Sequence, residues 1–272
     1  MASSINDVNG DGRPDIFVTN IWFTDEMTER MRLGSLDYNH DGNNLLINRG
    51  AGEFTDEAAE YGIRRGGWGW ASVLEDLDND GDLDLFHTTA NYKFDGRTAF
   101  SPEEAQELID QYSFYTYPVL YSGGDAGFEP VNISTAGFQE NDGRGVAALD
   151  ATGSGELDLL IGNTADNFTL YEQTGGSGNS LIIDVERGPD TSAFGATVTV
   201  ETANRTYHRW VTADVSYLSQ SDPAVHVGVG GSLEATVTVT WPNGEERTFE
   251  NLATNHRYRV DPSGVIDRRS FD

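Results

Sequence analysis

Cysteine is absent from this 272-residue chain, and lysine is nearly so. Without cysteine there is no disulfide framework, thiolate metal site or thiol nucleophile, so any bound metal must be a hard, oxygen-loving ion. Lys93 is the single lysine, and Lys plus Arg total 17 against 45 Asp plus Glu, which gives a formal net charge of −28. A surface this negative repels phosphate backbones and anionic lipids. These shortages argue against nucleic-acid binding and against attachment to anionic membranes.

Long apolar runs are also missing. No stretch approaches the roughly 20 residues needed to cross a bilayer, so we expect no membrane insertion. Residues 1–10 lack the basic and apolar regions of a signal peptide, which suggests that the chain is intracellular or that a signal has been removed. The hydrophobic content of 37% and the 31 glycines nevertheless suit a folded, turn-rich protein.

The acidic surplus has two explanations at the level of sequence. Asp-rich, Lys-poor surfaces are tolerated in a salt-rich medium, because screening removes the self-repulsion of so charged a chain. This explanation predicts a halophilic source. The other explanation is that carboxylates gather in order to hold cations, and the positions of the aspartates must distinguish the two.

A nine-residue acidic pattern recurs along the chain. It reads DVNGDGRPD at residues 7–15, DLDNDGDLD at 76–84 and DATGSGELD at 150–158, and each copy runs into a short apolar segment. Landmarks upstream of the second and third copies repeat at an offset of 74 or 75 residues. Such regular spacing predicts a repeated structural unit.

The sequence pattern around these copies is typical of an all-β protein. Short strands separated by Gly, Asn and Asp turns predict β repeats over residues 1–175, interrupted by helical inserts after Thr24 and Ser101, where N-cap and capping-box patterns occur. The run TGGSGNS at residues 174–180 reads as a linker, and alternating strands follow it. We therefore predict a repeat domain over 1–175 and a small sandwich- or barrel-like β domain over 176–272.

The spacing D-x-[D/N]-x-D-G-x-x-D has a direct chemical interpretation. Side chains at positions 1, 3 and 5 of a tight loop converge, glycine at 6 allows the turn, position 7 offers its carbonyl, and the carboxylate at 9 closes the shell. Oxygen ligands on a flexible loop suit Ca²⁺ better than Mg²⁺. An EF-hand is excluded because position 12 holds Val18, His87 and Ile161 in place of glutamate.

Two copies of the pattern predict full Ca²⁺ sites, and two stretches predict weaker ones. In the third copy, hydroxyls replace two acidic ligands. A fourth stretch, DYNHDGNN at residues 37–44, partly follows the pattern but has Leu45 where the closing carboxylate belongs. Ordinary turn chemistry explains these last two stretches equally well. The predicted ligands are Asp76, Asp78, Asp80, Asp82 (carbonyl) and Asp84; Asp7, Asn9, Asp11, Arg13 (carbonyl) and Asp15; Asp150, Thr152, Ser154 and Asp158; and Asp37, Asn39 and Asp41.

DLDNDGDLD with its following strand, together with the turn at residues 48–54, resembles the FG-GAP/VCBS repeats that form calcium-binding blades of β-propellers. Residues 193–201, 216–230 and 237–252 resemble the ASPIC/UnbV domain that follows such repeats in cartilage-acidic-protein-like chains. The resemblance implies an extracellular or cell-surface protein for adhesion or interaction, with no catalytic residues. Propellers need about four to eight blades to close, whereas this sequence supplies about three. We therefore expect a partial propeller that is incomplete, closed through a homo-oligomer, or remodelled.

Two functional classes follow from these observations. The first is a non-catalytic, Ca²⁺-stabilised module that presents loops to a protein or glycan partner. The second is a lectin or carbohydrate-active enzyme with an aromatic platform, although the acidic clusters are in metal spacing and leave no obvious carboxylate pair for hydrolysis. The platform residues would be Trp68, Trp70, Tyr112, Phe114, Tyr115 and Tyr117, which are better explained as core or cover for an insert. The first class is the favoured one.

Overall fold

The computed structural model describes residues 2–22, 41–89, 117–124, 126–133, 135–139, 142–164, 166–212 and 215–271. Within these ranges every regular element is a strand, so the all-β prediction is confirmed. The predicted helical inserts, after Thr24 and Ser101, lie outside the described residues. No described helix is long and apolar enough to span a membrane.

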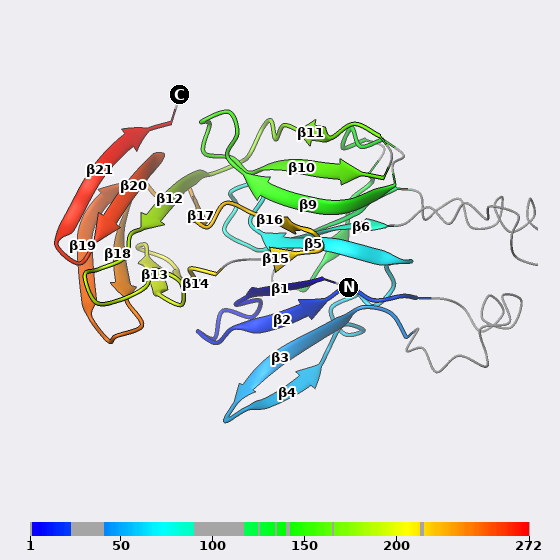
Figure 1. Ribbon diagram of the computed structural model, residues 1–272, viewed down its shortest axis with the longest axis horizontal. Coiled ribbons are helices and arrows are strands. Elements are labelled where there is room, and N and C mark those ends of the chain that lie inside the picture. The colour runs from blue at the N-terminus through cyan, green and yellow to red at the C-terminus, as the bar shows by residue number, and fades with distance from the viewer. Residues whose placement is uncertain are drawn as a thin grey trace, which may run out of the picture.

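Three antiparallel sheets carry the repeats, and each runs outward from its first strand as a propeller blade does (Figure 1). Blade 1 is β1 (Ser3–Asn6), β2 (Asp15–Val18), β3 (Asn44–Gly50) and β4 (Glu53–Asp56). Blade 2 is β5 (Gly69–Glu75), β6 (Asp84–Thr89), β7 (Val119–Ser122) and β8 (Glu129–Pro130). Blade 3 is β9 (Gly143–Leu149), β10 (Asp158–Asn163) and β11 (Thr169–Tyr171).

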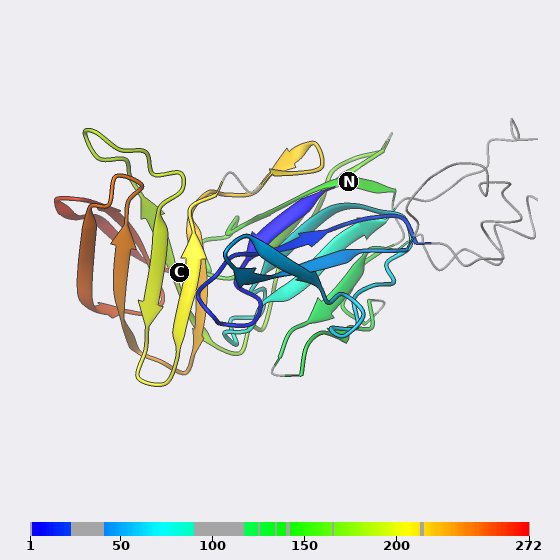
Figure 2. The same cartoon turned by 90° about the horizontal axis from the view of Figure 1, so that it is seen from below.

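Two further sheets form what we call the C-terminal sandwich (Figures 1 and 2). One sheet has the order β17 (Val225–Gly230), β12 (Asn179–Val185), β20 (His256–Asp261) and β21 (Gly264–Ser270). The other has the order β14 (Thr206–Trp210), β13 (Thr197–Glu201), β18 (Glu234–Thr240) and β19 (Glu246–Ala253). The described residues thus contain five sheets of three or four strands. The prediction of about three blades counts only the sheets of the repeats, and the C-terminal part adds two sheets of its own.

The cores follow from strand alternation, since successive side chains of a strand point to opposite faces. Between blades 1 and 2, Phe17, Leu45 and Leu85 are fully buried, and Val73 and Ile161 are fully buried between blades 2 and 3. A separate cluster fills the sandwich, and its largest members are Trp241 and Tyr258. Blade 2 is therefore packed on both faces, and blades 1 and 3 on one face each.

The faces of blades 1 and 3 that turn away from blade 2 carry rows of apolar side chains. Ile5 is 40% exposed, Leu160 is 36% exposed and Leu170 is 49% exposed. The strand registers align Ile5, Ile16 and Leu46 across blade 1, and Ala147, Leu160 and Leu170 across blade 3. Each flank of the three-blade arc thus resembles a face against which another blade would pack.

The inner strands of the three blades meet a segment of the C-terminal part. This segment, residues 215–222, contains the short strands β15 (Val215–Ser216) and β16 (Ser219–Gln220). Its serine hydroxyls accept hydrogen bonds from inner-strand amides: Ser72 donates to Ser216 over 2.9 Å, and Ala148 donates to Ser221 over 3.0 Å. The segment therefore satisfies backbone groups that would otherwise line the axis of the arc.

Candidate metal centre in the repeated acidic loops

Each acidic copy forms the loop between the first and second strands of its blade. We call residues 7–15, 76–84 and 150–158 loop 1, loop 2 and loop 3. The glycine at position 6 donates its N–H to the first aspartate in every case: Gly12 to Asp7 over 2.8 Å, Gly81 to Asp76 over 2.9 Å and Gly155 to Asp150 over 3.2 Å. These glycines have φ of +80°, +100° and +80°, a conformation that favours glycine. The repeated motif therefore encodes one turn geometry three times.

The closing aspartate at position 9 holds the loop to the rest of its blade. In loop 2, Asp84 accepts the N–H of Leu77 over 2.8 Å and the N–H of Gly123, just beyond β7, over 3.0 Å. The corresponding residues repeat this pattern: Asp15 accepts from Val8 and Asn48, and Asp158 accepts from Ala151 and Gln173. Sequence spacing predicted the metal role of this carboxylate and missed its structural one. Each carboxylate oxygen has a second lone pair, so the two roles are compatible.

Loop 2 is where the described residues bring three carboxylates together. One oxygen each from Asp76, Asp78 and Asp84 lies within 4.8 Å of the others. Asp76 is 0% exposed, and its Oδ1 has no hydrogen-bond partner among the described residues. A buried carboxylate oxygen without a partner is costly unless a cation compensates it. Loop 2 therefore fits a hard divalent cation, held by oxygens alone.

The electrostatics of loop 2 favour the same interpretation. Burial raises the pKa of Asp76 to about 7, and repulsion from neighbouring carboxylates adds to this effect while the Arg209 guanidinium opposes it. Burial likewise raises the pKa of Asp84 to about 7, against the two amide hydrogen bonds that it accepts. Without a cation the loop would hold protons near neutral pH. A bound Ca²⁺ would replace them and favour both ionised forms.

The remaining two predicted ligands of loop 2, Asp80 and Asp82, have different environments. Asp80 accepts the N–H of Asp82 over 2.8 Å, and its own N–H donates to Asp78 over 3.2 Å. The Asp82 side chain pairs with Arg205, the residue just before β14, over 2.6 Å. Asp82 is predicted to bind the metal through its main-chain carbonyl, and an ion pair of its side chain does not occupy that carbonyl.

In loop 1, one of the predicted carboxylate ligands is already paired with a cation from the same loop. Asp11 forms a close ion pair with Arg13 and also accepts from the Asn9 amide over 3.0 Å. Burial raises the pKa of Asp15, although less than that of its counterpart in loop 2. A cation entering loop 1 would have to displace Arg13 from Asp11, so the near-equality that the sequence suggests for loops 1 and 2 does not appear in the geometry.

Loop 3 and the fourth stretch are weaker candidates on geometry as well. In loop 3 the Thr152 hydroxyl donates to the Ser154 hydroxyl over 3.0 Å, which occupies two of the predicted ligands with each other. In the fourth stretch Asp41 forms an isolated β-bridge with Trp22. Asp37 and Asn39 lie outside the described residues.

The aromatic cluster around Trp70 is packed. Trp68 stacks on Trp70 at 5.9 Å, Tyr217 meets Trp70 edge-on at 4.8 Å, and the Arg144 guanidinium lies 4.4 Å from the Trp70 ring centroid. A sugar could stack on Trp70 only by displacing one of these neighbours. Tyr112, Phe114 and Tyr115 lie outside the described residues, so the predicted platform is not assembled from the part described.

Comparisons with known families agree with both predicted resemblances. Residues 7–87 match the family model described as FG-GAP-like repeat. Residues 186–266 match the one described as ASPIC and UnbV. The two matches cover the segment with loops 1 and 2 and most of the C-terminal sandwich.

Among curated proteins, the chain is similar to cartilage acidic protein 1 of three species. It is 27% identical to the Homo sapiens protein over 254 residues, covering 76% of this chain and 38% of that protein. Identity is 27% to the Mus musculus protein and 24% to the Xenopus tropicalis protein, each over 178 residues, covering 64% of this chain and 25% of the relative. The chain thus spans well under half the length of these relatives.

A solved structure of a candidate cell adhesion protein from Bacteroides ovatus aligns with 97% of this chain and 90% of its own. Its sequence identity is 12% and its TM-score is 0.19, so the likeness carries no argument.

Proposed function

We propose that this chain is a non-catalytic, Ca²⁺-binding interaction module and that loop 2 is its principal metal site. The observation that supports this most directly is the fully buried Asp76, whose Oδ1 has no partner in the described structure although two more carboxylates lie close by. Folding a carboxylate into such a position is unfavourable unless a cation binds there. The chemistry that Ca²⁺ supplies is charge compensation and cross-linking of the loop.

The ligand set follows the repeated motif. In loop 2 the side chains of Asp76, Asp78, Asp80 and Asp84 and the carbonyl of Asp82 would hold the ion. Loop 1 would use Asp7, Asn9, Asp11, Asp15 and the Arg13 carbonyl once Asp11 is released from Arg13. Loop 3 and the Asp37–Asp41 stretch would bind more weakly. All of these ligands are oxygens, which favours Ca²⁺ over transition metals.

We place the module outside the cell, in two domains over residues 1–175 and 176–272. Extracellular Ca²⁺-binding modules work with dissociation constants of about 10⁻⁴ to 10⁻³ M. Such weak binding suits loop 3, where hydroxyls replace carboxylates, and loop 1, where Asp11 is paired with Arg13. The similarity to cartilage acidic protein 1 supports an acidic protein of adhesion type, with a protein or glycan partner. Binding of that partner, and not turnover, is the activity proposed.

We also propose that a second copy of the chain completes the propeller. Three blades are fewer than the roughly four to eight that close a ring, and the outer faces of blades 1 and 3 are apolar and partly exposed. Sedimentation velocity tests this idea: a dimer that Leu160→Glu dissociates would support it, and a monomer at 100 μM would refute it.

Calcium binding is tested by isothermal titration of the chelator-treated protein, with Mg²⁺ as the competing ion. We expect loop 2 to bind Ca²⁺, Asp80→Ala to weaken that binding at least about tenfold, and Asp150→Ala in loop 3 to leave it unchanged. A wild-type protein that binds no Ca²⁺ at 10 mM would refute the proposal. Hydrolysis of any polysaccharide by the same preparation would refute its non-catalytic part.

A further inference from the structure

All three acidic loops pack against the C-terminal sandwich at the same position of the motif. A β-carbon added to Gly81 would lie 2.8 Å from the Tyr207 hydroxyl, and one added to Gly12 would lie 3.5 Å from His208 Nε2. A β-carbon on Gly155 would overlap the ring of Phe271. The position-6 glycines thus serve the turn and also allow the sandwich to approach, so the loops form the junction between blades and sandwich.

Loop 2 is the most deeply covered of the three. A β-carbon on Gly228 of β17 would overlap Asp76 Oδ2 and would lie 2.6 Å from the Asn79 Cα. Two backbone hydrogen bonds join loop 2 to this part of the chain: Gly230 at the end of β17 donates to the Asn79 carbonyl over 3.3 Å, and Ser177, in the segment that leads into β12, donates to the Asp78 carbonyl over 2.9 Å. The sandwich itself therefore contributes to the burial of Asp76.

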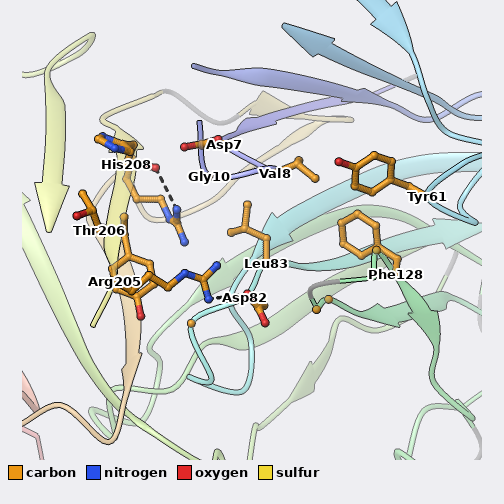
Figure 3. A pocket seen from close by; sticks show the side chains of 16 residues that line it. Asp7, Val8, Gly10, Tyr61, Asp82, Leu83, Phe128, Arg205, Thr206 and His208 are labelled. Carbon is orange, nitrogen blue, oxygen red and sulfur yellow. Dashed lines mark hydrogen bonds and ion pairs between the residues drawn. The ribbon is translucent and has the colours of Figure 1, made fainter. Parts of the chain in front are cut away.

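The sandwich also brings positive charge to loops 1 and 2. Figure 3 shows the cleft between these loops and β14, lined by Asp7, Asp82, Arg205 and His208 among others. Arg209 of β14 also lines this cleft. Arg209 is 5% exposed, and its Nη1 donates to the His208 carbonyl over 3.0 Å, while its Nε has no hydrogen-bond partner among the described residues.

The charges around Arg209 come from the end of β5 and from loops 2 and 1. Burial lowers the pKa of Arg209, and the carboxylates of Glu75, Asp76 and Asp7 act in the opposite direction. A guanidinium does not lose its proton in a protein. Arg209 is therefore a permanent internal cation placed beside the most buried carboxylate of loop 2.

We infer that Ca²⁺ in loop 2 and docking of the C-terminal sandwich stabilise each other, with Arg209 supplying part of the positive charge when Ca²⁺ is absent. This inference rests on the proposed function. Docking without Ca²⁺ buries the Asp76 carboxylate with one oxygen unpartnered, whereas docking with Ca²⁺ buries a compensated ion pair. The coupling is reciprocal, so docking must raise Ca²⁺ affinity by the factor by which Ca²⁺ favours docking.

The junction amides report docking directly. We would measure hydrogen exchange at Ser177 and Gly230 in the full chain, with Ca²⁺ and with chelator. The variants are Arg209→Met and, as a matched control, Arg247→Met on the exposed strand β19. Ca²⁺ should slow exchange at both amides about tenfold or more in the wild type. Without Ca²⁺, these two amides should exchange faster in Arg209→Met than in the wild type. With Ca²⁺, their exchange rates in Arg209→Met should approach the wild-type rates. In Arg247→Met the rates should match the wild type under both conditions.

Gly228→Ala tests the reverse direction of the coupling. It keeps every carboxylate but blocks the approach of β17, so Ca²⁺ affinity measured by titration should fall by about the factor found in the exchange experiment. An unchanged affinity would contradict the coupling.

The failures are distinguishable. Titration that detects Ca²⁺ binding while the wild-type junction amides exchange alike with and without Ca²⁺ would overturn this inference and leave the proposed function intact. Equal loss of protection by Arg209→Met in both conditions would show a purely structural arginine. The absence of Ca²⁺ binding in the wild type would instead overturn the proposed function.

Discussion

The stability that Ca²⁺ adds should depend strongly on pH. Asp76 and Asp84 have folded pKa values of about 7, above the ordinary 3.8. A carboxyl whose pKa is raised by folding favours the metal-free folded state at pH below 3.8, and this advantage is lost as the pH rises through about 7. At about 1.4 kcal/mol per pKa unit, the loss reaches on the order of 4 kcal/mol for each group. Ca²⁺ offsets it by binding the ionised forms.

Total stability alone would hide this effect. Burial lowers the pKa values of His87 and His226 to about 4 from 6.5. A histidine with a lowered folded pKa contributes stability above pH 6.5 that is lost as the pH falls through about 4, which opposes the carboxyl trend over the same window. The informative quantity is therefore the difference between melts with Ca²⁺ and melts with chelator, since the histidines contribute equally to both.

The expected size follows from competition between protons and Ca²⁺. With Ca²⁺ at about 100 times its dissociation constant at pH 8, binding adds about 2.7 kcal/mol. At pH 6, one unit below both pKa values, protons weaken the apparent affinity about a hundredfold, and the increment falls to about 0.4 kcal/mol. For a chain of this size these values correspond to about 5–10 °C at pH 8 and about 1–2 °C at pH 6.

Differential scanning calorimetry at several pH values, with fixed Ca²⁺ or chelator, measures this increment. Asp76→Asn should abolish most of it, and Asp150→Asn in loop 3 should preserve both its size and its pH dependence. An increment that is equal at pH 6 and pH 8, or larger at pH 6, would refute the assignment of Asp76 and Asp84 as titrating Ca²⁺ ligands.

Three other predictions concern separate features. Asp158→Asn should lower the free energy of unfolding in urea by about 1.5–3 kcal/mol, equally with and without Ca²⁺, because the carboxylate accepts the N–H groups of Ala151 and Gln173; a Ca²⁺-dependent loss would instead make it mainly a ligand. Trp241→Phe should cost about 1–3 kcal/mol in the same assay, since the fully buried indole donates to the Glu186 carbonyl over 2.9 Å, and Ca²⁺ affinity that falls with it would contradict a role confined to the sandwich core. Raising KCl from 0.1 to 2 M with Ca²⁺ present should raise the melting temperature, because a net charge of −28 repels itself in dilute buffer; full stability in dilute buffer would count against adaptation to salt.

Local chemistry explains what could be predicted from the sequence. Alternating apolar residues and Gly/Asn/Asp turns predicted strands, since both patterns depend on neighbours within a few positions. The turn of each acidic loop was predictable for the same reason: Gly81 donates to Asp76 five residues earlier, as Gly12 does to Asp7. Both the all-β class and the three repeated loops therefore followed from the sequence.

Contacts between residues far apart in sequence were not predictable in this way. Asp84 accepts the N–H of Gly123, 39 residues away, and Ser72 donates to Ser216 across 144 residues. No local pattern marks either pair. The structural role of the closing aspartates and the segment across the inner strands thus appear only once the blades are assembled.

Which loop is the better candidate for a metal site was also decided by the tertiary structure. Sequence alone made loops 1 and 2 nearly equal, because their ligand residues are nearly the same. Packing separates them: the sandwich covers Asp76 with Gly228 and leaves one oxygen unpartnered, whereas Asp11 in loop 1 pairs with Arg13. The sequence by itself determined where oxygen ligands gather, since that depends on turn geometry. Only the tertiary structure decided which loop keeps a buried carboxylate oxygen without a partner, since burial and compensation depend on what packs against the loop.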